Sequence, residues 1–199
     1  YDVIELPNNR LGIFIADVAD KGMPAALFMA LTRTLMRAAI LETSSPAEAL
    51  RRVNDSLLPD TQQGMFITAV YGELDLDQGT FTYVNAGHNP PFWVKTDGSF
   101  EKLTRTSIAL GVMEQPSIEQ RVISFKPGET LLLYTDGLTE AFSPSGDLFG
   151  EVRLLDVMAS LTAGTAEEVI VSIEECLNDF VDTEPLADDL TMLAIRMVG

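Results

Sequence analysis

A strand that ends in an acid and runs directly into a helix constrains this chain more than any other feature. Residues 13–27 begin as an apolar strand, place Asp17 at its end and turn through a short charged loop closed by Gly22. Pro24 falls in the first turn of the following helix, where a missing backbone N–H costs nothing. The carboxylate of Asp17 and the backbone carbonyl of Val18 are oxygen ligands that suit a hard cation. The alternative interpretation is that Asp17 only starts the turn.

Length and charge limit the class of protein. With 199 residues the chain suits one domain, residues 1–199, with a substantial buried core. Its formal net charge of −17 argues against nucleic acid or an anionic membrane as a partner, because both would repel it at long range. The same acidic excess is compatible with cation binding or with basic partners.

Cysteine usage and apolar runs indicate the compartment. Cys176 is the one cysteine, so no disulfide framework is expected and a reducing cytoplasm is predicted. The apolar runs are broken by charges before the roughly 18 residues that a membrane span needs. No basic segment followed by an apolar one opens the chain, so no secretory signal is expected. The chain starts at Tyr1 without a methionine, which predicts a domain truncated at its N-terminus.

The first 58 residues predict a hairpin and two helices. Residues 1–6 and 11–16 are separated by a Pro-Asn-Asn-Arg turn and should pair as antiparallel strands. A helix is predicted over 23–43. A second helix, ending near residue 58, is predicted to open with a reciprocal capping box at 45–48, with Pro in its first turn.

The helix predicted over 23–43 carries an apolar stripe. Its members recur at helical spacing and are predicted to face the core: Leu27, Phe28, Leu31, Leu35, Met36 and Ile40. Arg33 and Arg37 lie one turn apart on the other side. We expect these arginines to form a solvated or partner-facing edge.

From residue 65 the pattern changes to strands separated by turn chemistry. Six strands are predicted, over 65–76, 80–85, 92–95, 100–103, 118–125 and 130–134. Two helices follow over 151–161 and 165–181, the second opened by another capping box, and a last strand is predicted over 188–197. This order predicts an α+β fold, an α/β/β/α sandwich of two mainly antiparallel β-sheets flanked by helix pairs.

Acids occupy equivalent places in this scheme. Asp17 and Asp136 each follow an apolar strand, and Asp188 and Asp189 are predicted to start the last one. Carboxylates brought together at the edges of packed sheets would repel one another unless a cation lay between them. An all-oxygen ligand set favours Mg²⁺ or Mn²⁺ over Zn²⁺, and two such ions roughly 3.5 to 4 Å apart could activate a water against a phosphoryl group. The alternative is that these acids simply begin turns.

Four segments resemble the successive motifs of a known family. Residues 17–30, 85–91, 134–140 and 188–191 are similar, in the same order, to those of SpoIIE/RsbU-type phosphatases, the bacterial branch of the metal-dependent PPM serine/threonine phosphatases. The resemblance implies a two-sheet sandwich, two Mn²⁺ or Mg²⁺ ions and hydrolysis of phosphoserine or phosphothreonine on a protein. Such a substrate is typically an anti-sigma-factor antagonist, and the module often follows a sensory or receiver domain.

The resemblance also assigns roles to residues. Asp17 would bridge both metal ions and the Val18 carbonyl would bind one of them. Asp136 and Asp188 would bind the other ion. Asp188 matches the family ligand better than Asp189, which fills the neighbouring place.

Two departures from the family pattern bear on activity. Ala19 and Asp20 replace the usual Ser-Gly, which adds a charge and removes no ligand. Tyr1 and Asp2 resemble the end of a Gly-Asp-Tyr-Tyr-Asp-like segment, which would place the first metal-binding acid just before this chain. Asp2 could replace it, but its side chain should point to the opposite face from the one required, or lie a turn too late. We therefore expect this fragment to be metal-poor or weakly active.

Alternatives remain open at this point. His88 is either a turn residue or a contact for substrate or phosphate, and no catalytic role is given to Cys176. The competing class of function is a phosphatase-like regulatory module that has lost catalysis and docks, or forms a homodimer, through its first two helices. A third possibility is a cation-binding protein without enzymatic activity.

Overall fold

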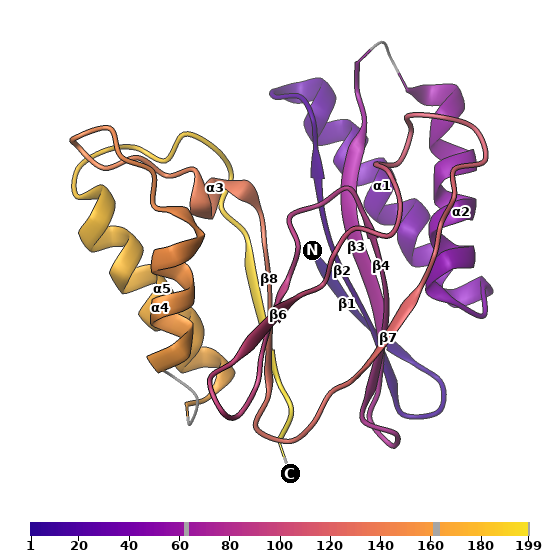
Figure 1. Cartoon of the computed structure of the whole chain (residues 1–199). Helices are drawn as coiled ribbons and strands as arrows, with labels where there is room; N and C mark the ends of the chain where they lie inside the picture. Colours follow the sequence, from indigo (N-terminus) through magenta and orange to yellow (C-terminus); the bar gives the residue numbers. More distant parts are fainter. Residues whose placement is uncertain (62–63, 161–163, 199) are drawn as a thin grey trace. The chain divides into compact units, whose positions relative to one another are not determined.

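The protein forms two compact units, each with one sheet and its own helices (Figure 1). The structure is a computed structural model that describes residues 1–61, 64–160 and 164–198. Unit 1 comprises Tyr1–His88 and Thr104–Phe125, and unit 2 comprises Asn89–Leu103 and Lys126–Gly199. In each unit an antiparallel sheet carries helices on one face, which confirms the predicted α+β class with two antiparallel sheets and helix pairs.

The sheet of unit 1 has the order β1-β2-β3-β4-β7, and every pair of neighbours is antiparallel. Its strands are β1 Asp2–Leu6, β2 Arg10–Val18, β3 Ile67–Asp75, β4 Thr80–Ala86 and β7 Arg121–Ser124. The predicted first hairpin is confirmed. Asn8 and Asn9 have φ values of 61° and 54°, the left-handed pair that a tight hairpin turn requires.

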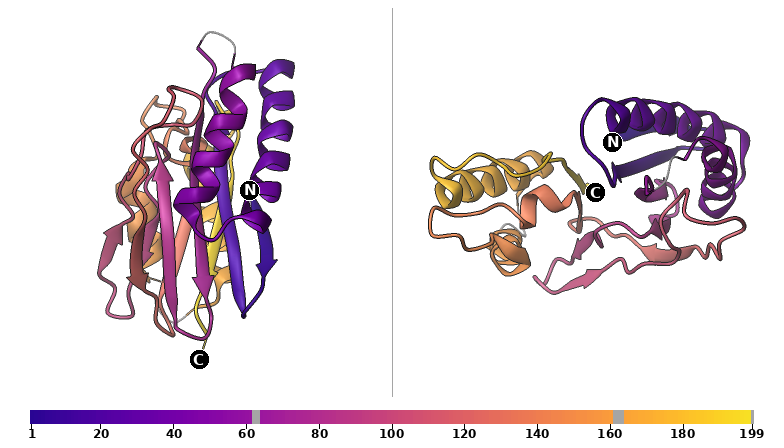
Figure 2. Two further views of the ribbon diagram at one scale, coloured as in Figure 1. Left: turned by 90° about the vertical axis from the view of Figure 1, so that its right-hand side faces the viewer. Right: turned by 90° about the horizontal axis from the view of Figure 1, so that it is seen from above.

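Two helices cover one face of this sheet and run side by side (Figure 2). Helix α1, Met23–Glu42, packs on β1 and β2, and α2, Pro46–Leu57, packs on β3 and β4; a short 3₁₀ helix, Leu58–Asp60, follows. The side chain of Ser45 accepts the N–H of Glu48, but the Glu48 carboxylate accepts the N–H of Ser44. The predicted capping box of α2 is therefore only half formed.

The predicted core stripe of α1 is partly wrong. Phe28, Met36 and Ile40 are buried against the sheet, whereas the side chains of Leu27 and Leu31 are 66% and 36% exposed. Successive residues of a helix are rotated by about 100° around its axis. A flat sheet that covers the row of Phe28 and its helical neighbours therefore leaves the row of Leu27 and Leu31 uncovered. An apolar row of α1 therefore faces away from the sheet.

Length and composition alone would allow α1 to cross a membrane. A stretch of 18 residues within Met23–Glu42 reaches the required hydropathy, and one third of that stretch is buried inside the protein. Arg33 and Arg37 interrupt the apolar residues of this helix, as expected from the sequence. Its buried residues belong to the core of unit 1.

Arg33 and Arg37 do not form a merely solvated edge. Both guanidinium groups contact the carboxylate of Asp2 on β1, with N–O distances of 2.9 and 2.6 Å. Burial of Asp2 raises the pKa of its carboxyl, but the hydrogen bond from Arg37 and the charges of both arginines outweigh this effect and hold the pKa below its ordinary value. The ion pairs therefore tie the first strand to α1.

The sheet of unit 2 has the order β6-β5-β8-β9, again antiparallel throughout. Its elements are β5 Phe92–Val94, β6 Phe100–Lys102, β8 Thr130–Tyr134, α3 Asp136–Thr139, α4 Gly150–Ser160, α5 Ala166–Val181 and β9 Met192–Arg196. Helices α4 and α5 cover one face of this sheet. The reciprocal capping box of α5 is confirmed, with Thr165 and Glu168 each accepting the other's N–H.

Three predictions for unit 2 need comment. The last strand begins at Met192, so the prediction that Asp188 starts it is wrong. Helix α3 was not predicted, because four residues after a strand carry too little periodicity. The helix predicted over 151–161 corresponds to α4, and its predicted end at residue 161 lies outside the described residues.

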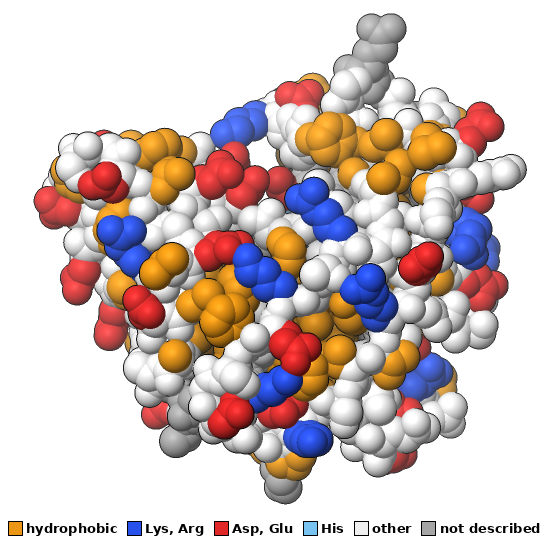
Figure 3. Space-filling model, viewed as in Figure 1, with side chains coloured by type: hydrophobic (Ala, Val, Ile, Leu, Met, Phe, Trp, Pro, Cys, Tyr) orange, Lys and Arg blue, Asp and Glu red, His pale blue; other side chains and the backbone are white. Residues whose placement is uncertain are grey.

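The surface of unit 2 is acidic on its helical side. Helix α5 carries five carboxylates and no lysine or arginine, and Figure 3 shows acidic side chains spread over this part of the molecule. Such a surface repels polyanions.

We expect the substitution Asp2→Asn to lower the free energy of unfolding by about 1 kcal/mol at pH 7, because both arginine partners are half-exposed and the pairs are partly screened. The folded-state pKa of Asp2 is lowered, so its contribution is complete above the unfolded pKa of about 3.9 and disappears as the pH falls through the folded value. Urea unfolding between pH 2 and 7 measures this difference. Glu5→Gln, at an exposed position on the same strand, is the control; equal stability of the Asp2 variant and the wild type at pH 7 would contradict the account.

Candidate metal and active site

Asp17 is the penultimate residue of β2, in unit 1. The strand register places it directly opposite Thr68 on β3, and its side chain is half-buried. After Val18 the chain leaves the sheet, with the N–H of Ala19 bonded to the carbonyl of Phe66 at 2.9 Å. The carboxylate is therefore carried by a strand whose backbone is fixed on both sides of it.

The backbone carbonyl of Val18 already accepts one hydrogen bond. The N–H of Asp20 donates to it at 2.8 Å within the turn. A carbonyl oxygen has two lone pairs, so one remains for a cation. Gly22, the residue before α1, has a φ of 85° and lacks the Cβ that would make this conformation strained.

Unit 2 brings the other two predicted ligands together along the backbone. Asp136 is the first residue of α3, immediately beyond the end of β8. The segment that contains Asp188 passes directly over it: a Cβ added to Gly137 would lie 2.4 Å from the carbonyl oxygen of Asp189 and 3.2 Å from that of Asp188. Glycine at this position permits the close approach of the two segments.

Thr135 holds these segments in place. Its side-chain hydroxyl donates to the carbonyl of Asp189 at 3.0 Å and accepts the N–H of Thr191 at 2.9 Å. Its backbone N–H donates to the carbonyl of Thr191 at 3.0 Å. This residue extends the contact between the end of β8 and the segment before β9 beyond the regular ladder.

Tyr134, the last residue of β8, anchors the same strand end. Its ring stacks on Phe92 and its hydroxyl contacts Glu151 of α4 at 3.4 Å. Burial raises the pKa of Tyr134, and the negative charge of Glu151 raises it further. The phenol therefore stays protonated and acts as a neutral anchor.

The described residues do not assemble a three-acid metal cluster. In residues 1–61, 64–160 and 164–198, no group of three or more His, Cys, Asp or Glu side chains is placed to hold a metal ion. Asp17 lies in unit 1, and Asp136 and Asp188 lie in unit 2. The donor set itself, three carboxylates and a carbonyl, has the oxygen chemistry that Mg²⁺ or Mn²⁺ requires.

Asp2 is not available to replace a missing ligand. It pairs with Phe14, which belongs to the helix-covered core, so its side chain lies on that face of the sheet and is bound by Arg33 and Arg37. Side chains on β2 alternate between faces, and Asp17 lies on the other one. This arrangement confirms the expectation that Asp2 points to the opposite face.

His88 is a buried residue of the turn that follows β4. Its side chain is 2% exposed, and its Nδ1 lies 2.8 Å from the hydroxyl of Thr68. Sequence reasoning missed Thr68, Thr135 and Gly137, because the partner of each lies far away in the chain and no local pattern indicates the contact.

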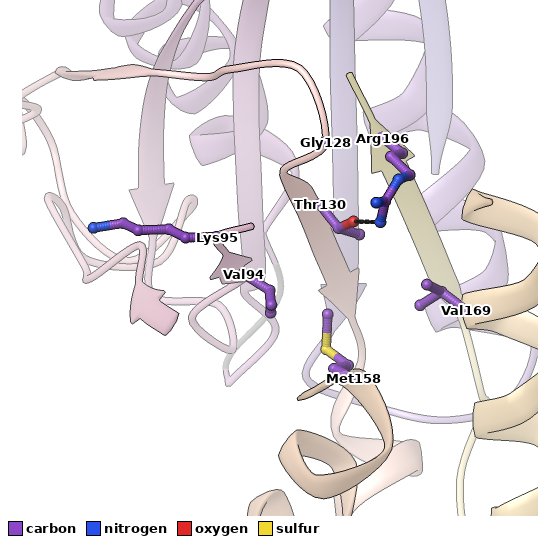
Figure 4. A pocket seen from close by; sticks show the side chains of 7 residues that line it. All are labelled: Val94, Lys95, Gly128, Thr130, Met158, Val169 and Arg196. Carbon is purple, nitrogen blue, oxygen red and sulfur yellow. Dashed lines mark hydrogen bonds between the residues drawn. The ribbon is translucent and has the colours of Figure 1, made fainter. Parts of the chain in front are cut away.

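A pocket in unit 2 lies away from Asp136. It is lined by Val94, Lys95, Gly128, Thr130, Met158, Val169 and Arg196 (Figure 4). Thr130 starts β8 and Asp136 follows its end, so the two are separated by roughly 17 Å of strand. The pocket is too narrow to admit a water molecule, and we assign no function to it.

Solved structures define the class of fold. The RsbU and RsbW domains of Rv1364c from Mycobacterium tuberculosis match 98% of this chain and 55% of that one, with 27% identity and a TM-score of 0.83. The PP2C phosphatase domain of SpoIIE from Bacillus subtilis matches 98% of this chain and 57% of its own, with 18% identity and a TM-score of 0.84, which shows a shared fold. The chain therefore has a PP2C-type phosphatase fold.

Sequence comparison gives the family. The model of the family described as stage II sporulation protein E (SpoIIE) matches residues 7–198, so this chain belongs to the SpoIIE family. It is 32% identical to Protein IcfG of Synechocystis sp. over 223 residues, covering 98% of this chain and 35% of that protein. It is 29% identical to the phosphoserine phosphatase RsbU of Bacillus subtilis, covering 94% of this chain and 55% of RsbU. The chain thus spans between about a third and about half of these relatives.

We expect Gly137→Ala to destabilise the protein by about 2 kcal/mol, because the added Cβ would collide with the backbone of Asp189. Urea unfolding measures the loss. The control is Glu140→Ala, an exposed position at the end of the same short helix. Equal stability of both variants would show that the segments of Asp136 and Asp188 are not in close contact.

Proposed function

We propose that this chain is a metal-dependent serine/threonine phosphatase domain that hydrolyses phosphoserine or phosphothreonine on a protein. Membership of the SpoIIE family and the names of relatives such as RsbU support a phosphatase. The observation that carries the proposal is the close pairing of the Asp136 and Asp188 segments in unit 2. Acids held on rigid backbone are what a hydrolytic metal site needs.

The proposed ligand set is Asp17, the carbonyl of Val18, Asp136 and Asp188. Asp17 would bridge two ions, Val18 would contact one, and Asp136 with Asp188 would contact the other. Bound divalent cations would lower the pKa of a water molecule and polarise the phosphoryl group. Thr135 and Gly137 support the proposed unit 2 ligands, because their contacts hold the backbone of residues 188–191 beside the end of β8.

Cys176 is not proposed as a covalent nucleophile. Cys176 is half-buried on α5 and packs against the core of unit 2. A nucleophilic mechanism needs an activated thiol or hydroxyl beside a base, and the structure assigns Cys176 no such setting.

Partners and context are proposed from the family. The substrate would be a phosphorylated protein of the anti-sigma-factor-antagonist type, and a sensory or receiver domain would precede this module in the full-length chain. The module would act in the cytoplasm, with Mn²⁺ or Mg²⁺ as cofactor.

Asp136→Asn should lower Mn²⁺-dependent turnover by more than about a hundredfold, because it removes a proposed direct ligand and outer residues alone account for 10- to 100-fold. The assay measures phosphate release by the full-length protein from a phosphoserine peptide, before and after removal of metal with EDTA and return of Mn²⁺. Asp156→Asn, on the exposed face of α4, is the control. Activity that persists after EDTA, or an Asp136 variant as active as the control, would contradict the proposal.

A further inference from the structure

Asp17 and Thr68 share one face of the sheet in unit 1. Residues on β2 and β3 that face the helices alternate with those that do not, and the register pairs them across the strands. The helix-facing pairs in the core are Phe14 with Tyr71, Ala16 with Ala69, and Val18 with Ile67. Asp17 and Thr68 therefore both lie on the helix-free face, with Cβ atoms about 4.5–5.5 Å apart.

His88 fixes the hydroxyl of Thr68. The distance between Nδ1 and Oγ1 is 2.8 Å, and the ring is almost completely buried. The backbone N–H of His88 donates to the side-chain carbonyl of Asn85 at 2.9 Å, and Asn85 is itself fully buried. Two hydrogen bonds thus hold His88: one joins its ring to Thr68 on β3, and the other joins its backbone N–H to the side chain of Asn85.

The turn that carries His88 is rigid for a second reason. Gly87 has a φ of 78°, and a Cβ there would meet the backbone of Ala109 at 3.0 Å. The carbonyl of Asn85 accepts the N–H groups of Thr106 and Ser107 at 2.9 and 3.1 Å. The imidazole therefore has a fixed place relative to β3, and the threonine hydroxyl has a fixed rotamer.

We propose that His88 is a positioning residue for Asp17, acting through Thr68. In the tautomer with the proton on Nδ1, the ring donates to Thr68, and the hydroxyl proton can then be donated to the Asp17 carboxylate on the same face. That hydrogen bond would limit the rotamers of Asp17 and leave its second oxygen for a cation. This inference rests on the proposed function, which makes Asp17 a metal ligand.

The expected effect follows from metal sites in general. Groups that hydrogen-bond a ligating side chain usually contribute 10- to 100-fold to metal affinity. Thr68→Val removes the hydroxyl and keeps the shape and strand preference, so we expect Mn²⁺ binding to weaken about tenfold. Thr68→Ser keeps the hydroxyl and should restore affinity to within about threefold of the wild type. His88→Ala should weaken binding as much as Thr68→Val.

Calorimetric titration of Mn²⁺ into the metal-free full-length protein measures these affinities without any assay of activity. If His88 acts through Thr68, the double variant binds Mn²⁺ no more weakly than either single variant, because both remove the same contact. Thr32→Val is the matched control, since Thr32 is a buried threonine of the same unit whose hydroxyl bonds only its own helix in the described contacts. Circular dichroism melts report the fold of each variant, and the Thr68 pair decides the question if His88→Ala does not fold.

Two failures are distinguishable in this experiment. Wild-type affinity in Thr68→Val, or equal weakening in Thr68→Ser, would overturn the role of His88 and leave the proposed metal site intact. Additive losses in the double variant would likewise overturn it. A wild-type protein that binds no Mn²⁺ would overturn the proposed function itself, and the role of His88 with it.

Discussion

The unit 2 part of the candidate site depends on the hydrogen bonds of Thr135, which continue beyond the last regular pair of β8 and β9. Thr135 uses its hydroxyl and its backbone N–H to hold the segment before β9 against the end of β8. Without these three hydrogen bonds, nothing in the regular pairing of Thr130–Tyr134 with Met192–Arg196 would keep Asp188 near Asp136. The close approach at Gly137 makes the arrangement specific, since any side chain there would displace the Asp189 backbone.

In unit 1, strand register and one turn determine the surroundings of Asp17. Alternation along β2 places Phe14, Ala16 and Val18 on the helix-covered face and Asp17 on the other, where buried Ile13 and Ile15 precede it. The same register brings Thr68 opposite Asp17, and the turn after β4 brings His88 to Thr68. The half-buried carboxylate of Asp17 thus lies opposite Thr68, whose hydroxyl is in contact with the buried ring of His88.

The sequence predicts the local parts of this account well. Turn residues predict the first hairpin, capping residues predict α5, and apolar strands predict that Asp17 and Asp136 stand at strand ends. Prediction from the sequence fails where a feature depends on contacts between residues that are distant in the chain. Thr135 binds the segment before β9 more than fifty residues away, and the exposure of Leu27 depends on which row of α1 packs against the sheet. The contact between His88 and Thr68 requires the register of β3 with β4 and the turn after β4, which no single segment specifies.

The proposed function requires that the carboxylates of Asp17, Asp136 and Asp188 bind divalent cations. The most direct measurement is an anomalous-scattering map from a crystal of the full-length protein grown with Mn²⁺. We predict anomalous peaks within coordination distance, about 2.0–2.2 Å, of the carboxylate oxygens of Asp17, Asp136 and Asp188. A map in which manganese contacts none of these residues, or contacts them only in separate places, would contradict the account.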